Sequence, residues 1–241
     1  MPVDSRKVES PAVAKPHGDK IDFDDYSHDY EGLLRESTKL YTDDTEYFAK
    51  YKVELTRQDL HAPVKRVLEY GCGTGRNIPF LQAAFPEAEV VGTDVSAESL
   101  RVARTDNPGA RFELESVDLE LGQFDLIFIA CVFHHIPPAE RESAMKSLAA
   151  RLAPRGSICV FEHNPFNPVT RKLVNECPFD ADAVLLKPGE LRGLFRHAGI
   201  RLDGVSYCLF VPPRLSWFIP LEKYLRWLPM GGQYWIRGSA P

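Results

Sequence analysis

The sequence has no apolar run long enough to cross a bilayer and no charged-then-apolar leader at its start. These absences argue against stable membrane insertion and against secretion. Cysteine is also scarce, and the 5 cysteines, at positions 72, 131, 159, 177 and 208, show no paired spacing typical of a zinc site or a redox motif. Because an odd number of cysteines suits a reducing compartment, we expect a cytoplasmic protein.

Runs of lysine and arginine are absent as well, and the net charge of -5 is spread along the chain. This distribution argues against nucleic acid as a partner. No internal repeat is found. With 241 residues and 44% hydrophobic content, the chain can bury one core. We therefore expect a flexible tail over residues 1–20, which lack an apolar period, and a single domain over residues 21–241.

The most informative stretch is an apolar strand over residues 66–70 that runs into a loop with glycine at positions 71, 73 and 75. Glycine reaches positive backbone dihedrals and lets a ligand approach the main chain. A helix follows from about Asn77, and a second strand ends in Asp94, whose carboxylate can accept both hydroxyls of a ribose. These features predict a site for an adenosine-containing cofactor. The alternative is a tight strand-to-helix turn that binds nothing.

Two classes of cofactor fit such a loop. A dinucleotide fingerprint needs a further glycine where this chain has Arg76. Acid-x-Gly-x-Gly-x-Gly, with Glu69 as the acid, instead resembles motif I of the class I S-adenosylmethionine-dependent methyltransferases. The resemblance implies S-adenosyl-L-methionine as cofactor, with its methionine part held by Glu69 and the loop amides and its ribose by Asp94. An NAD(P)-dependent oxidoreductase is the second reading, and a cofactor-binding protein without catalysis is the third.

Strands and helices alternate beyond residue 62, which predicts an α/β, doubly wound and mostly parallel sheet with ligands at the carboxyl ends of its strands. The resemblance implies a seven-stranded Rossmann-like sheet with the last strand antiparallel. It covers residues 23–241, though its specific motifs lie between Glu69 and Glu162. We expect helices over residues 21–62 that form an N-terminal lid, and a core over residues 63–241 with acceptor-pocket insertions near 163–187 and 208–231. Expected strands are 66–70, 90–94, 111–114, 124–131, 156–162, 200–207 and 232–238, and expected core helices are 77–85, 97–106, 138–152 and 188–198.

Two histidines follow the fourth expected strand, at His134 and His135, just before an apolar residue and a proline. In the resembled family this loop, which here includes Cys131, lines the sulfonium and the acceptor. Methyl transfer is an in-line displacement that needs positioning and, for a protonated acceptor, a base. A histidine suits that task. His135 is the first candidate and His134 the second, while a hydrogen bond to a loop carbonyl is the alternative for either ring.

Polar side chains also follow the fifth expected strand, where Glu162 and His163 are candidates to orient the acceptor. The nearby Asn164 and Asn167 alternatively form turns with their own backbone. A metal held by these histidines and Glu162 is conceivable. Because adjacent residues at a strand end point in different directions, however, we expect no metal.

The third strand departs from the resembled family, because it lacks the Gly-Asp pair that in many members binds adenine. Asp118 with Leu119 is one candidate, and Ser116 is the alternative. Near the N-terminus, Tyr26 and Tyr30 lie on one helical face and either close over the cofactor or pack on the core. Lys50 and Lys52 are candidates for the methionine carboxylate, and Ser96 caps the next helix, binds ligand, or does both. The predicted cofactor-binding set is Glu69, Gly71, Cys72, Gly73, Gly75, Asn77, Asp94, Val95, Ser96, Asp118, Leu119, Cys131, Tyr26 and Tyr30.

All three tryptophans lie in an aromatic stretch over residues 207–235. Such a stretch can enclose a bulky acceptor, form a homodimer face or touch a membrane surface, and the sequence does not choose among these. Taken together, the residues and the resemblance predict transfer of a methyl group to an oxygen or nitrogen of a small-molecule acceptor, with S-adenosylhomocysteine as the second product.

Overall fold

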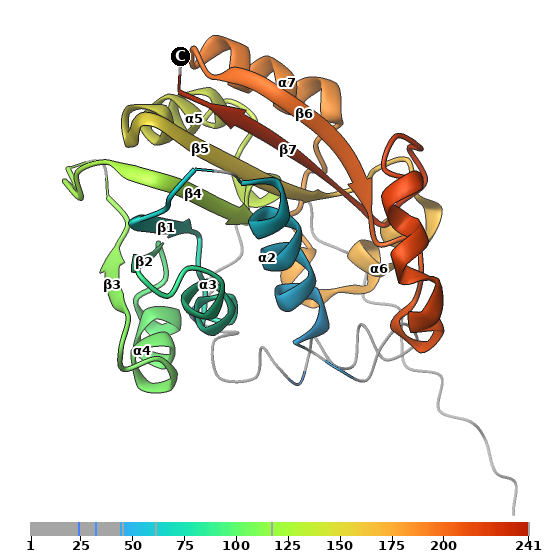
Figure 1. The fold of residues 1–241 in the computed structure, drawn as a ribbon, viewed down its shortest axis with the longest axis horizontal. Helices are drawn as coiled ribbons and strands as arrows, with labels where there is room; N and C mark the ends of the chain where they lie inside the picture. The colour runs from blue at the N-terminus through green and yellow to red at the C-terminus, as the bar shows by residue number, and fades with distance from the viewer. Residues whose placement is uncertain are drawn as a thin grey trace, which may run out of the picture.

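The computed structural model describes Asp24, Gly32, Asp44 and residues 46–60, 62–116 and 118–240. In this part of the chain, seven strands form one sheet in the order β3-β2-β1-β4-β5-β7-β6 (Figure 1). Neighbours from β3 to β5 pair in parallel, and β7 pairs antiparallel with both β5 and β6. The predicted fold class, with an antiparallel last strand, is confirmed. The strands are β1 (Arg66–Tyr70), β2 (Glu89–Asp94), β3 (Arg111–Leu114), β4 (Phe124–Ala130), β5 (Leu152–His163), β6 (Arg201–Cys208) and β7 (Gln233–Ser239).

Helices cover both faces of the sheet. On one face Met145 of α5 and Phe195 of α7 pack against strand residues such as Ile127. On the other face Val53 of α2 and Leu81 of α3 belong to a second buried cluster, which also includes residues of α4 (Figure 1). The helices are α2 (Tyr47–Asp59), α3 (Ile78–Ala84), α4 (Ala97–Asp106), α5 (Arg141–Ala150), α6 (Pro168–Glu176) and α7 (Pro188–His197), with 3-10 helices η2 (Phe133–His135), η3 (Pro178–Asp180) and η4 (Pro213–Tyr224).

Most expected elements are present with shifted ends, and one helix was missed. Helix α4 has the expected bounds, whereas α5 begins three residues later than expected and β5 begins four residues earlier. The missed helix is α6, whose first turn is capped by Asn167: the side-chain oxygen accepts from the amides of Val169 and Thr170. The Asn-Pro pair at its start is a helix-start signal that reads equally well as a turn.

Several expectations concern residues outside the described part. The expected tail over residues 1–20 lies there, as does nearly all of the first expected N-terminal helix. The second expected helix is α2. The single-domain reading and its boundaries stay predictions. Of the expected insertions, the first contains α6 and η3, and the second contains η4.

Glu222 in η4 joins the C-terminal segment to α2. Its carboxylate is buried and accepts hydrogen bonds from the Tyr51 hydroxyl and from the amides of Phe210 and Val211, the last two at 2.8 and 2.7 Å. A carboxylate with several donors fixes the two chain segments relative to each other. Glu222 thus ties η4 to α2. In Figure 1 the segment that carries η4, coloured red, lies next to α6.

We expect Glu222→Ala to lower the free energy of unfolding by about 2 kcal/mol, because three donors lose their buried partner. Urea denaturation followed by circular dichroism measures this change. The neighbouring Lys223 is exposed, and Lys223→Ala should change the free energy by less than about 0.5 kcal/mol. Equal stability of the Glu222 and Lys223 variants would contradict the assigned role of Glu222.

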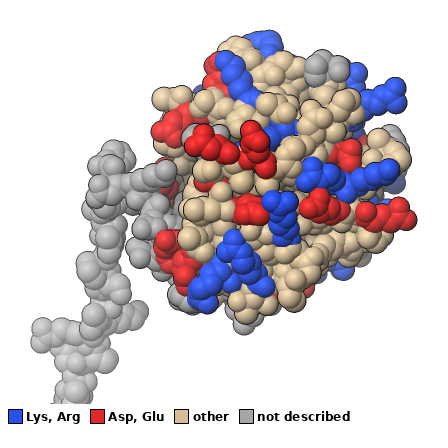
Figure 2. Space-filling model, turned by 90° about the vertical axis from the view of Figure 1, so that its left-hand side faces the viewer, with Lys and Arg blue, Asp and Glu red and all other residues tan. Residues whose placement is uncertain are grey.

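The surface is mixed in charge. Figure 2 shows lysine and arginine side chains interspersed with aspartate and glutamate on the face it presents.

All five cysteines are free thiols. None of the helices in the described ranges combines the length and apolarity needed to cross a bilayer.

Candidate functional site

A cavity of about 920 Å³ lies at the carboxyl ends of the parallel strands. Its walls come from the loops after β1, β2, β3 and β4, from the end of β5, and from α2, α6 and the C-terminal segment. One end is formed by the glycine loop and Asp94. The other end holds His134, His135 and His163. The cavity thus joins the two sets of residues that the sequence assigns to the cofactor and to catalysis.

The glycine loop adopts backbone conformations that suit close approach of a ligand. Gly71 and Gly73 have φ of 69° and 52°, in the left-handed region that favours glycine. A Cβ at Gly71 would lie 2.6 Å from a methyl of Val132, whereas a Cβ at Gly73 would meet nothing within 4 Å. Gly71 is therefore required by packing, and Gly73 keeps an open approach to the main chain on the cavity wall.

Asp94 fixes this loop. Its two carboxylate oxygens accept from the amides of Gly73 and Ser96, at 2.7 and 2.9 Å. Burial raises the pKa of Asp94, and the hydrogen bonds from Ser96 and Gly73 oppose that rise. Ser96 caps α4 by accepting from the Ser99 amide at 2.9 Å, and its hydroxyl donates to Asp24 at 2.5 Å. Asp94, the residue assigned to the ribose, thus also fixes the glycine loop and the start of α4.

Glu69 lies at the end of β1 with 1% of its surface exposed. The Asn77 side chain donates to its Oε1 at 2.5 Å, and its Oε2 has no hydrogen-bond partner among the described residues. Burial raises the pKa of Glu69 to about 8, against the opposing effects of Asn77 and of the Lys52 charge. A buried carboxylate with a spare oxygen is ready to accept from a ligand amine.

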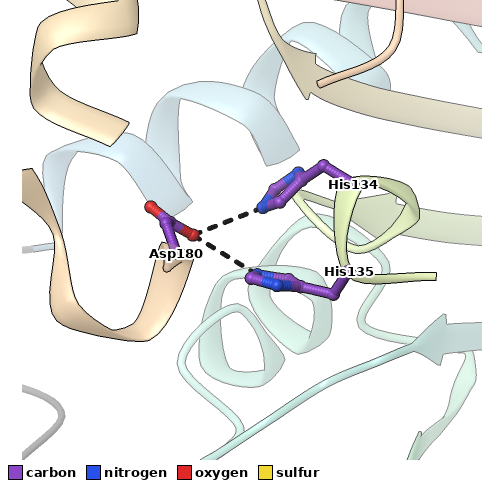
Figure 3. A group of neighbouring side chains, drawn as sticks. All are labelled: His134, His135 and Asp180. Atoms are coloured by element: carbon purple, nitrogen blue, oxygen red, sulfur yellow. Dashed lines mark ion pairs between the residues drawn. The ribbon is translucent and has the colours of Figure 1, made fainter. Parts of the chain in front are cut away.

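At the opposite end, two neighbouring histidines converge on one carboxylate (Figure 3). Nε2 of His134 lies 3.5 Å from Oδ1 of Asp180, and Nε2 of His135 lies 3.3 Å from the same oxygen. On the far side of each ring, Nδ1 of His134 is 2.6 Å from Glu162, and Nδ1 of His135 is 3.2 Å from Asp182. The expectation that adjacent histidines point apart is wrong, because they lie in the 3-10 turn η2 and not at a strand end.

Glu162 organises this turn. It is fully buried, and its Oε1 accepts from the amides of Val132 and Phe133 at 3.2 and 2.8 Å. Burial opposes the ionised form of Glu162, but the charge of His134 and its hydrogen bond outweigh burial and lower the carboxyl pKa. Burial likewise opposes the imidazolium of His134, yet Glu162 and Asp180 raise the pKa of that ring to about 10.

Cys131 lies on the cavity wall, where it interacts with both Lys52 and His163. It has a φ of 61°, which is strained for a residue with a side chain, and Gln233 donates to its sulfur at 3.3 Å. Burial opposes the thiolate, but Lys52 and His163 lower the pKa of the thiol to about 7. Gln233 Oε1 is a second buried acceptor without a hydrogen-bond partner among the described residues.

The predicted cofactor residues divide according to where the structure places them. Gly75 packs against α4, where a Cβ would meet Ala103 at 3.1 Å and Asn107 at 2.8 Å. Asp118 is exposed and Leu119 packs against the core, so neither lines the cavity, whereas the alternative Ser116 does. Ser96 and Glu69 are buried and are not among the residues that line the cavity. Tyr26 and Tyr30 are outside the described residues. The residues on the wall are Gly71, Cys72, Gly73, Asn77, Asp94, Val95 and Cys131.

The candidates after β5 also separate. His163 lines the cavity, with its ring centroid 5.0 Å from that of His134. The Asn164 side chain accepts from the Phe166 amide at 3.1 Å and donates to the Gly231 carbonyl at 2.8 Å. Asn164 therefore forms a turn, as the alternative expected. Asn167 caps helix α6, and it also lines the cavity.

Sequence reasoning missed Asp180, Asp182 and Gln233. They lie in stretches of sequence that contain no motif. Their contacts with the site residues span 45 or more residues, so no local signal marks them. Lys52 was found only as one of two lysines on an expected helix. Its side chain is buried and lines the cavity.

The chain was compared with known proteins. Residues 68–158 match the family described as Methyltransferase domain. The chain is 33% identical over 178 residues to a trans-aconitate 2-methyltransferase of Variovorax paradoxus, covering 65% of this chain and 68% of that protein. It resembles the structure of a SAM-dependent methyltransferase from Thermotoga maritima with a TM-score of 0.63, at 19% identity, over 91% of this chain and 98% of that one. For phosphoethanolamine N-methyltransferase 2 of Haemonchus contortus, solved with S-adenosyl-L-methionine, the TM-score is 0.63 at 14% identity, over 92% and 60% of the two chains.

Because these solved structures are only 19% and 14% identical to the chain, their similarity shows the fold alone. Further relatives named trans-aconitate 2-methyltransferase are matched over 50% and 66% of their own length. The alignments thus reach about half to two thirds of the proteins concerned.

Proposed function

This chain belongs to the class I S-adenosyl-L-methionine-dependent methyltransferases, and we propose that it methylates an oxygen of a small carboxylic acid. S-adenosyl-L-methionine is its cofactor and supplies the methyl group. The family favours methyl transfer over the alternatives of a nicotinamide-dependent oxidoreductase and of binding without catalysis. The observation that carries the acceptor proposal is the single cavity that joins the glycine loop to the three histidines.

The residues at the loop end fit this cofactor in chemical type. The unpartnered Oε2 of Glu69 suits the amino group of the methionine part, and the buried ammonium of Lys52 suits its carboxylate. Asp94 would accept from the ribose hydroxyls, and Gly73 leaves the main chain open. Ser116 on the cavity wall is the candidate for the adenine edge.

The residues at the other end suit an acid as acceptor. His163 lines the cavity at the end of β5, where a ring N–H can donate to a carboxylate oxygen, and the neighbouring His135 lines the same part of the wall. Trans-aconitate, which names the Variovorax relative, is a carboxylic acid. A carboxylate is ionised at neutral pH, so it needs orientation and no general base. A nitrogen acceptor is the second outcome that the experiment below distinguishes.

In this proposal the protein promotes methyl transfer by orienting the acceptor relative to the cofactor. Glu162 and Asp182 hold the rings of His134 and His135 in place on the wall, and His163 beside them would orient one acceptor oxygen toward the cofactor end. The apolar side chains of Val174, Phe210 and Met230 line the same cavity and would exclude water from the reacting atoms. Binding and exclusion of water are then the main contributions of the protein.

Two measurements test the proposal. Calorimetry with S-adenosylhomocysteine and with NAD should give saturable binding of the first and none of the second. Transfer of a labelled methyl group should then be followed across a panel of di- and tricarboxylic acids, phenols and amines. Labelling of amines with none of the acids would contradict the acid proposal, and no labelling of any acceptor with intact cofactor binding would leave it without support.

We expect Asp94→Ala to weaken binding of S-adenosylhomocysteine by about 2 to 3 kcal/mol, or roughly 30- to 150-fold. The variant loses the acceptor for the ribose and also the partner of the Gly73 amide. Calorimetry gives the dissociation constant. Asp106→Ala, at the exposed end of α4, is the matched control and should bind like the parent. An unchanged constant in Asp94→Ala would remove Asp94 from the site.

We place the protein in the cytoplasm, which fits its free thiols. Nucleic acid as a partner is not favoured by the mixed charges of the face in Figure 2. A homodimer is compatible with the exposed Trp217 and Trp227, which are 72% and 75% exposed.

A further inference from the structure

Three side chains at the acceptor end form a compact group of metal-ligand type. They are His134, His135 and Asp180, and one ligand atom from each lies within 4.8 Å of the others. Figure 3 shows both imidazole rings, which come from η2, directed at the same carboxylate of Asp180, which comes from η3 on the other side of the gap. All three residues line the cavity, so the group is reachable from it. Two imidazoles and one carboxylate are a ligand set that binds divalent transition metals.

Each histidine has a second carboxylate on its other nitrogen. Glu162 lies 2.6 Å from Nδ1 of His134, and Asp182 lies 3.2 Å from Nδ1 of His135. A carboxylate on Nδ1 keeps a proton on that nitrogen, so Nε2 is the nitrogen that would bind a metal ion once its own proton is displaced. In both rings it is Nε2 that faces Asp180. Both histidines thus have a carboxylate on Nδ1 and direct Nε2 at Asp180. A hydrogen bond between one histidine and Asp180 would not require this arrangement to occur twice.

The spacing also fits a shared ion better than direct hydrogen bonds. Bonds of about 2.0 to 2.1 Å in a tetrahedral site place the ligand atoms about 3.3 to 3.4 Å apart. The two distances from Nε2 to Asp180 are 3.3 and 3.5 Å. Good N–H···O hydrogen bonds are shorter, about 2.7 to 3.2 Å. The contacts on the Nδ1 side are as short as such hydrogen bonds or shorter, at 2.6 and 3.2 Å.

The charges around the group favour a cation. Glu162, Asp180 and Asp182 bring three carboxylates to two imidazoles, and the next ring, His163, lies 5.0 Å from His134 between centroids. Three carboxylates beside two imidazoles make this end of the cavity an acidic environment, which attracts cations. A divalent ion compensates most of that charge.

We propose that Nε2 of His134, Nε2 of His135 and the carboxylate of Asp180 bind one divalent transition-metal ion such as Zn²⁺. The inference deepens the proposed function, on which it rests for its role: the ion keeps a coordination position toward the cavity for an oxygen of the acid acceptor. Mg²⁺ and Ca²⁺ are excluded as preferred occupants, because they take oxygen ligands. The acceptor would then be held by the ion and aimed at the cofactor end.

The experiment uses the full-length protein, stripped with a chelator and titrated with Zn²⁺ in a calorimeter. We expect saturable binding of about one ion per chain, and none with Mg²⁺. Titration with Co²⁺ should produce visible absorption bands of a low-symmetry site with nitrogen and oxygen ligands. Because His134 and Asp180 are nearly buried and their variants could fail to fold, the first variant is His135→Ala, which keeps both of them. It should weaken Zn²⁺ binding by about 100-fold or more, and Asp182→Asn by about 10- to 100-fold.

The matched control is His197→Ala. His197 is an exposed histidine that also pairs with a carboxylate, Glu142, at 3.2 Å but lies on α7. It should bind Zn²⁺ as the parent does. No saturable Zn²⁺ binding by the parent, or equal affinity in folded His135→Ala and Asp182→Asn, would overturn the site. Calorimetry with S-adenosylhomocysteine on the same samples separates the two ideas, because loss of metal binding alone leaves the cofactor and acid proposals intact.

Discussion

Replacing Glu162 by alanine is expected to lower the free energy of unfolding by about 3 to 5 kcal/mol, as for other broken buried charge pairs. The side chain is fully buried and accepts from two backbone amides and from His134. Its removal leaves these donors in a dry site and lets η2 shift. Because misplacement of a positioning group by about 1 Å can cost about 100-fold in rate, methyl transfer should fall by at least that factor. Urea denaturation and single-turnover transfer of a labelled methyl group measure the two effects.

Glu162→Gln gives the contrasting result. Its amide oxygen still accepts from Val132 and Phe133, but its NH₂ group faces Nδ1 of His134, so the ring loses the carboxylate that favours its protonated form. We expect a smaller loss of stability than in Glu162→Ala and a loss of rate that remains large. Glu142→Ala, on the exposed face of α5, should change the stability by less than about 0.5 kcal/mol. Wild-type stability in Glu162→Ala would show that the turn does not depend on this carboxylate.

Replacing Glu69 by glutamine is expected to make the cofactor-free protein more stable at pH 8 and nearly unchanged below pH 5. The folded carboxyl has a pKa of about 8, mainly because of burial, against an unfolded value near 4.5. Between these values the folded chain holds a proton that the unfolded chain has released. The free energy of unfolding therefore falls as the pH rises from about 4.5 to 8, by roughly 3 to 5 kcal/mol in total.

Glutamine cannot ionise, so Glu69→Gln removes this fall. Denaturation curves at pH 5, 6, 7 and 8 measure it, and Glu54→Gln on the exposed side of α2 should keep the wild-type slope. The same variant should bind S-adenosylhomocysteine about 10- to 100-fold more weakly, since a charge-assisted bond to the amino group is lost. A wild-type slope together with wild-type affinity would mean that Glu69 is neither buried in this way nor used by the cofactor.

Much of the fold was predictable because its signals are local. The strands alternate with amphipathic helices, and the apolar runs of the parallel strands are bounded by clear turns. The position of β7 between β5 and β6 came from the resemblance to a family and not from any pattern in residues 233–239. Helix α6 was not predicted, because the Asn-Pro pair at its start is typical both of a turn and of a helix N-cap. Only the hydrogen bonds of Asn167 in the structure distinguish the two.

The site was predictable where one loop contains it. The residues from Gly71 to Asn77 lie within one turn and interact with the end of the neighbouring strand, so spacing alone places them near Asp94. The acceptor end was not predictable in this way. His134 was found, but its partners Glu162 and Asp180 are 28 and 46 residues away, and the direction of its ring depends on the 3-10 turn.

By itself, the sequence determined the edge of the sheet that carries the chemistry, because a glycine-rich bend after a strand is visible in adjacent residues. The cofactor class came from the resemblance of that bend to a family motif. The tertiary structure decided what happens at the other end of the cavity. Imidazoles and carboxylates from three separate segments meet there only after β4, β5 and η3 have packed together. Long-range packing, unlike a turn, leaves no periodic trace in the order of the residues.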